Sequence, residues 1–97
     1  MTSTRPLTFA ERARLLPALK RFPEARAALQ RLFRDSTSFQ SLCEDYRDCL
    51  AALQYWEQST SAEAAALAKS YAELLGELEQ EVKQFLEDSQ ALRVGTP

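Results

Sequence analysis

Three carboxylates lie close together near the middle of the chain, at Glu44, Asp45 and Asp48. On a helix they would fall on neighbouring turns, and acidic side chains arranged in this way can hold a metal ion inside a helical bundle. The chain has no histidine, however, and so lacks the commonest metal ligand and general base. Because Arg47 lies beside them, we interpret the three carboxylates as a solvated acidic face. We expect no metal ion and no other cofactor.

The two cysteines, Cys43 and Cys49, are six residues apart. On one helix this spacing separates their Cα atoms by about 9 Å along the axis, which is more than the roughly 7 Å that a disulfide allows. The pair also lacks the spacing of zinc ligands. We therefore expect two buried, reduced thiols, which suit a cytoplasmic protein.

Other signs of chemistry are also missing from the sequence. It contains no glycine-rich phosphate loop and no G-x-S-x-G motif, so we expect no catalytic residue and no enzyme. It also contains no run of about 18 apolar residues, so we expect no membrane-spanning helix.

Charge is divided unevenly along the chain. Residues 1–34 carry eight Lys or Arg and two Glu, a net charge of +6, whereas residues 35–97 carry a net charge of −8. One interpretation is that the basic front packs beside the acidic back, within one chain or across a dimer. The other is that the basic segment 12–34 is free to meet nucleic acid or an acidic partner, with Arg26, Arg31 and Arg34 as possible contacts.

The elements that must position these residues are helices. Between residues 37 and 57 the large apolar side chains are spaced 3, 4, 3, 4 and 3 apart, which places them on one stripe of a helix. A second helix is predicted over residues 61–88, and the short turn between the two makes them antiparallel. The expected seam of this hairpin consists of Phe39, Leu42, Tyr46, Leu53, Trp56, Tyr71, Leu78 and Phe85.

The short turn also predicts a register. Reflection about Gln58–Thr60 sets Phe39 near Leu78 and Val82, and Tyr46 near Tyr71 and Leu74. Trp56 is expected to pack in the seam. Tyr55 points elsewhere, so it is a possible partner contact, and a binding module should expose an apolar patch around Tyr55 or Phe9.

A helical segment over residues 9–34 precedes the hairpin. Thr8 and Glu11 match a capping box, and Pro17 predicts a kink or a break into two pieces. Pro23 suits the first position of a new helix. Two more capping boxes are expected at Thr37–Gln40 and Thr60–Glu63. The chain is predicted to be one domain, with flexible tails at 1–7 and 90–97.

The pattern Phe22-Pro23-Glu24, followed by Leu29 and Leu32 and then by Phe39, Leu42 and Tyr46, resembles the opening of the YdcH-like family of small bacterial helical-hairpin proteins. Leu78-Glu79-Gln80-Glu81-Val82 with Leu86 is similar to a later motif of that family. Ser36 stands where the family usually has Asp, and Glu79 where it usually has Lys. The resemblance implies a helical hairpin and brings no catalytic residue with it.

We therefore expect an all-α fold, in which a long antiparallel hairpin is covered by a kinked N-terminal helical segment to make a three- to four-helix bundle. The apolar stripe is broad for one chain, so we expect a homodimer. The expected function is that of a non-enzymatic interaction or scaffold protein acting through helix faces. The alternative is a small nucleic-acid-associated or regulatory protein that uses the basic segment 12–34.

Overall fold

The computed structural model describes residues 6–94, with side chains described as far as Gln90. This part of the chain is all α-helical and contains no strand, which confirms the predicted fold class. A single turn of 3-10 helix, η1, lies between the first two α-helices. The elements in chain order are α1 (Phe9–Arg21), η1 (Pro23–Ala25), α2 (Arg26–Asp35), α3 (Thr37–Gln58) and α4 (Ala64–Val94).

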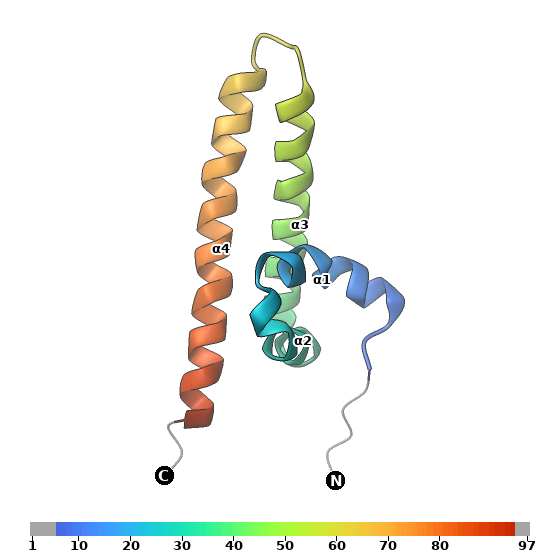
Figure 1. Cartoon of the computed structure of the whole chain (residues 1–97), viewed down its shortest axis with the longest axis vertical. Helices are drawn as coiled ribbons and strands as arrows, with labels where there is room; N and C mark the ends of the chain where they lie inside the picture. Colours follow the sequence, from blue (N-terminus) through green and yellow to red (C-terminus); the bar gives the residue numbers. More distant parts are fainter. Residues whose placement is uncertain (1–5, 95–97) are drawn as a thin grey trace.

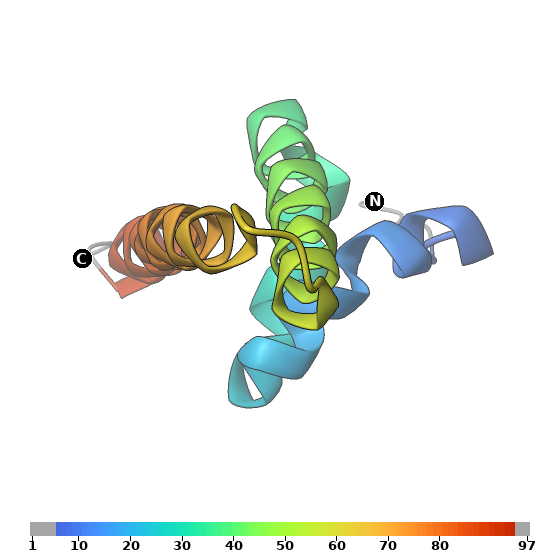
Figure 2. The same ribbon diagram turned by 90° about the horizontal axis from the view of Figure 1, so that it is seen from above.

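The two long helices, α3 and α4, run antiparallel as a hairpin, and α1 and α2 lie against its lower half (Figure 1). The upper half of the hairpin rises beyond both N-terminal helices, so the described chain is elongated, at 57 × 30 × 21 Å. Seen from above, α1 approaches α3 from the side away from α4 (Figure 2). Its first turns therefore project sideways from the hairpin.

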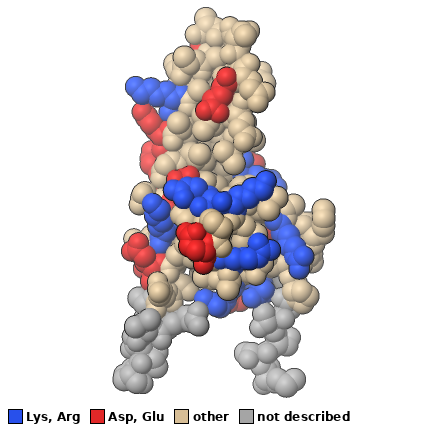
Figure 3. Space-filling model, in the orientation of Figure 1, with Lys and Arg blue, Asp and Glu red and all other residues tan. Residues whose placement is uncertain are grey.

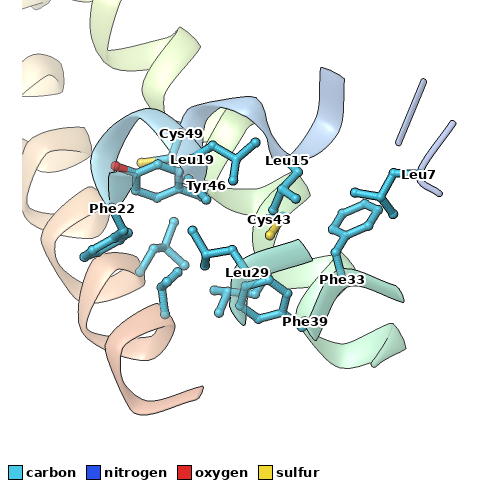
Figure 4. Packing of buried hydrophobic residues seen from close by; sticks show 14 residues of the cluster. Leu7, Leu15, Leu19, Phe22, Leu29, Phe33, Phe39, Cys43, Tyr46 and Cys49 are labelled. Carbon is cyan, nitrogen blue, oxygen red and sulfur yellow. The ribbon is translucent and has the colours of Figure 1, made fainter. Parts of the chain in front are cut away.

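The core lies where all four helices meet (Figure 4). Burying each of its large apolar side chains contributes about 1.5–3 kcal/mol, so this level anchors the fold. Leu7 joins the same cluster and is only 7% exposed, so the predicted flexible start at 1–7 is wrong for this residue. Residues 1–5 lie outside the described part. The largest fully buried side chains are Leu15, Leu29, Phe33, Phe39, Cys43 and Val82.

The start of α1 is capped as the sequence predicts. Thr8 accepts a hydrogen bond from the Glu11 backbone N–H at 3.1 Å, and the Glu11 carboxylate accepts one from the Thr8 N–H at 2.9 Å. The helix then continues through Pro17 as one element, so the predicted break into two pieces does not occur. Proline leaves the carbonyl four residues earlier without its donor, and that residue, Ala13, is exposed to water.

The starts of α2 and α3 differ from the prediction. Pro23 opens η1, and α2 begins only at Arg26. The cap of α3 is Ser36 and not Thr37, because the Ser36 hydroxyl accepts the hydrogen bond from the Phe39 N–H at 3.1 Å. Adjacent hydroxyl residues offer equivalent caps, and the sequence alone does not choose between them.

The last helix also has different ends. It begins at Ala64, so the expected capping box at Thr60–Glu63 is wrong, and it continues to Val94 instead of ending near Asp88. Residues 90–94 of the predicted C-terminal tail are therefore helical, whereas residues 95–97 lie outside the described part.

The connection between α3 and α4 is consequently five residues long, and this moves the register. The Phe39 ring meets Phe85 edge to face with centroids 5.2 Å apart, one helical turn further along α4 than expected. Tyr46 likewise bonds to Glu79, which lies further along α4 than the expected Tyr71 and Leu74. A longer connection moves the reflection point from residue 59 to about residue 61, and each residue of α3 then meets a later part of α4.

Candidate interaction surface

The predicted seam residues divide into three groups in the structure. Those on the lower and middle hairpin are buried, namely Phe39, Leu42, Tyr46, Leu53 and Leu78. Tyr71 and Phe85 are partly buried against the same cluster. Trp56 is half-buried and lies outside the buried cluster, because no N-terminal helix reaches that level of the hairpin.

A groove of about 340 Å³ lies between α3 and α4. Most of its lining is apolar, and Leu74 at its edge is 42% exposed. The two walls are held together at Cys49, whose thiol donates a hydrogen bond to the Tyr71 carbonyl at 3.3 Å. The groove is lined by Asp45, Asp48, Cys49, Ala52, Tyr71, Leu74 and Leu78.

Acidic side chains line the groove on the α3 side and lie on the neighbouring edge of α4. Asp45 and Asp48 stand on the α3 side, and both are exposed. On α4, Glu77 and Glu81 follow Leu74 by three and seven residues, which places them along the same edge of the helix, and both are exposed. Within the described residues Asp48 has a 3.6 Å contact with its neighbour Arg47, and no cation pairs with the other three.

Above the groove, the tip of the hairpin presents two aromatic rings. Tyr55 is 65% exposed, and its ring meets Trp56 edge to face with centroids 4.9 Å apart. Trp56 follows Asp45, Cys49 and Ala52 at spacings of 4, 3 and 4, so it continues the α3 wall of the groove toward the tip.

Two arginines attach α1 to the hairpin. Arg14 forms an ion pair with Glu44 of α3 and stands over the Phe33 ring at 5.2 Å from its centroid. Arg21 pairs with Glu79 of α4 at 3.2 Å, and Tyr46 of α3 donates to the same carboxylate oxygen at 2.9 Å. Basic α1 therefore does pack beside acidic side chains of its own chain.

Burial and these contacts also change the pKa values of the buried tyrosine and cysteine side chains. Burial raises the pKa of Tyr46 to about 12, and the hydrogen bond to Glu79 adds to the shift. Burial raises the pKa of the Cys43 thiol to about 12 as well, against the opposing effect of Arg14. Both cysteines are free thiols and buried, and burial raises the pKa of Cys49 too.

The arginines singled out from the sequence, Arg26, Arg31 and Arg34, form no ion pair with a described residue. Lys and Arg gather in a belt across the lower half of the molecule, over the N-terminal helices, while the hairpin tip above is mostly uncharged (Figure 3). Part of the basic surface therefore stays free.

The exposed face of α1 was not predicted from the sequence as one surface, because only the apolar side chains on the buried face were considered. Phe9 and Leu16 are 88% and 45% exposed, and Arg12 and Lys20 are exposed beside them. The four residues are spaced 3, 4 and 4 apart, so they share one face of the helix, away from buried Leu15. The same spacing in the sequence could have predicted this exposed face.

Among residues 6–90, no group of three or more Cys, Asp or Glu side chains is placed to hold a metal ion. No helix in the described part of the chain is long and apolar enough to cross a membrane. Comparison with family models, with curated proteins and with solved structures finds no match to this chain. Membership of the YdcH-like family therefore stays a prediction.

Proposed function

We propose that this chain is a non-enzymatic interaction or scaffold protein that acts through the faces of its helices and associates with itself. The observation that carries the proposal is the upper half of the hairpin, which α1 and α2 leave uncovered. A two-helix hairpin cannot enclose its own apolar stripe, and here Tyr55, Leu74 and the groove beside them remain open. Exposed apolar side chains at the groove and at the hairpin tip favour an interaction role for the upper hairpin.

The fold and the thiols support two finer points of this proposal. The helical hairpin agrees with membership of the YdcH-like family, whose resemblance runs through Phe22 to Tyr46. Two buried, reduced cysteines suit a cytoplasmic location, where thiols are kept reduced.

Sedimentation velocity from micromolar to millimolar concentration tests self-association directly. We expect a concentration-dependent shift from monomer to dimer, and a monomer throughout that range would overturn this part of the proposal. Affinity capture from a lysate of the source cell, with and without nuclease, tests the interaction role. One protein recovered in stoichiometric amount under both conditions supports that role, and recovery that disappears with nuclease contradicts it.

A second candidate function is nucleic-acid association or regulation through segment 12–34. The unpaired arginines of α2 and the basic belt favour it. Each phosphate contact releases counterions, so binding of this kind weakens steeply as salt rises. Binding of labelled duplex and single-stranded nucleic acid at two salt concentrations tests this candidate, and Arg26→Glu with Arg34→Glu should reduce both the affinity and the salt slope.

A further inference from the structure

Two exposed surfaces of the described chain carry opposite charge around an apolar centre. The α1 ridge consists of Phe9, Arg12, Leu16 and Lys20. The acidic groove is the hollow between α3 and α4, with Asp45 and Asp48 in its lining and the exposed Glu77 and Glu81 on the neighbouring edge of α4. The ridge offers an aromatic and an aliphatic side chain flanked by two cations. The groove offers an apolar floor with two carboxylates in its lining and two more on the neighbouring edge of α4.

The two surfaces also match in length. Phe9 and Leu16 are seven residues apart, which is about 10.5 Å along a helix axis. The groove lining runs from Asp45 to Ala52 on one wall and from Tyr71 to Leu78 on the other, and the ends of each stretch are again seven residues apart. A third helix laid between two others completes a common form of helical bundle.

The ridge and groove of one chain cannot meet each other. Arg14 and Arg21 fix α1 to the hairpin through Glu44 and Glu79, with Leu15 buried beneath them. The ridge therefore faces away from its own hairpin, and the first turns of α1 project sideways (Figures 1 and 2). The described part of the same chain leaves this ridge exposed, so another molecule can reach it.

We propose that the α1 ridge of one copy docks in the acidic groove of a second copy of this chain. This inference rests on the proposed function and names the surfaces through which the chain associates with itself. Apolar contact of Phe9 and Leu16 with the groove floor supplies the affinity, and the charges fix the partner and the direction. Each copy has both surfaces, so a two-fold arrangement allows both contacts in one closed dimer.

Charge alone favours a second copy over a membrane or a nucleic acid as the occupant of the groove. The carboxylates in the groove and on the neighbouring edge of α4 repel phosphate and anionic lipid, and they attract a cationic helix. The chain itself supplies such a helix at equal concentration, with apolar side chains of the required spacing. Groove-to-groove pairing of two copies would instead bring like charges together.

The first test is Phe9→Ser, measured by sedimentation and by thermal unfolding at a concentration where the protein is monomeric. Phe9 is almost fully exposed, so monomer stability should stay unchanged while dimer affinity falls by about tenfold or more, as for an anchor residue at an interface. Ala27→Ser, at an exposed position of α2 outside the ridge, is the control and should leave the affinity unchanged. Equal affinities for Phe9→Ser and wild type would overturn the proposal.

The second test exchanges charges. Arg12→Glu with Lys20→Glu, and separately Asp45→Lys with Glu77→Lys, should each weaken association about tenfold or more because like charges would then meet. Combining all four substitutions in one chain should restore affinity, which a general loss of folding would not allow. Arg26→Glu with Lys69→Glu is the control of equal charge change and should have no effect.

The outcomes separate this inference from the function on which it rests. If the wild-type chain dimerises but neither charge exchange alters its affinity, the ridge and groove pairing is wrong while self-association stands. If the wild-type chain stays monomeric up to millimolar concentration, self-association itself fails and the pairing fails with it. Restoration of affinity in the fourfold variant supports both.

Discussion

The Tyr46 hydroxyl of α3 donates a 2.9 Å hydrogen bond to the Glu79 carboxylate of α4, and Arg21 of α1 pairs with the same oxygen. One partly buried carboxylate thus joins three helices at the level of the core. The corresponding region of the upper hairpin has no third helix, which is why the lower half holds the fold together and the upper half is free to interact.

Loss of this carboxylate should destabilise the protein. Glu79→Ala removes the acceptor of Tyr46 and the partner of Arg21, so we expect the free energy of unfolding to fall by about 1–3 kcal/mol, measured by urea denaturation. Glu77→Ala is the control, because Glu77 is exposed and faces like charges at Glu73 and Glu81. The control should be neutral or slightly stabilising. Equal losses in the two variants would contradict the role of Glu79.

The arginines of α1 should matter more for stability than those of α2. Arg14→Glu places a negative charge beside Glu44 and removes the contact with the Phe33 ring, so we expect a loss of about 1–2 kcal/mol. Arg26→Glu with Arg31→Glu should cost less than about 0.5 kcal/mol, because neither residue has an ionic partner in the described chain. Urea denaturation at low salt checks both. A larger loss for the α2 pair would contradict the docking described here.

Stability should fall at alkaline pH. The folded-state pKa of Tyr46 is raised from 10.0 to about 12 and that of Cys43 from 9.0 to about 12, so both groups favour the neutral form in the folded protein. Their contribution is fully present below the unfolded pKa values and is lost as pH rises from 9 toward 12. The melting temperature measured across that range should drop.

Two tyrosine variants separate this effect from general alkaline unfolding. Tyr46→Phe should flatten the fall in melting temperature, because its ring does not ionise, although it starts from a lower stability. Tyr55→Phe changes an exposed tyrosine and should leave the profile as in the wild type. Identical profiles for the two variants would argue against an ionising Tyr46 as the cause.

Replacement of Gly76 by alanine should increase the stability of the protein. It lies inside α4 without a positive φ, and a Cβ built there meets nothing within 4 Å. Gly76→Ala should therefore stabilise the protein by about 1 kcal/mol, and Ala72→Gly, one turn away and exposed, should destabilise it by a similar amount. Thermal unfolding measures both. A loss of dimer affinity in Gly76→Ala would instead show that a second helix approaches closely at this glycine.

The sequence was sufficient for the helices and for their antiparallel pairing. Apolar spacing specifies which residues share a face, and Phe39, Tyr46 and Leu53 are buried as that spacing requires. Helix ends were less predictable because Ser36 and Thr37 are equally good caps, and the same ambiguity at Ser59–Ser61 hid the true start of α4. An error of a few residues in the predicted length of the turn shifts the expected pairing of α3 with α4 by a full helical turn.

The groove, and which arginines form ion pairs with the hairpin, could not be predicted from the sequence for a different reason. Asp45, Cys49 and Ala52 share a stripe that the sequence does show, but the groove exists only because α4 is rotated to bring Leu74 and Leu78 opposite. Charge imbalance gave the sign of the attraction between α1 and the hairpin. It could not say that Arg14 and Arg21 make the pairs, because that depends on how α1 crosses α3.

The two buried thiols contact different helices, so their reaction with a thiol reagent can report on two different contacts within the protein. Cys43 lies in the core near Arg14 of α1, whereas Cys49 is bonded to the backbone of α4. An alkylating reagent can reach Cys43 when α1 lifts from the hairpin, and Cys49, which lines the groove, when its hydrogen bond to the α4 backbone breaks. Mass spectrometry of the two labelled peptides would therefore give a separate labelling rate for each cysteine. Each rate reports how often the contact that covers that cysteine opens in the wild-type chain.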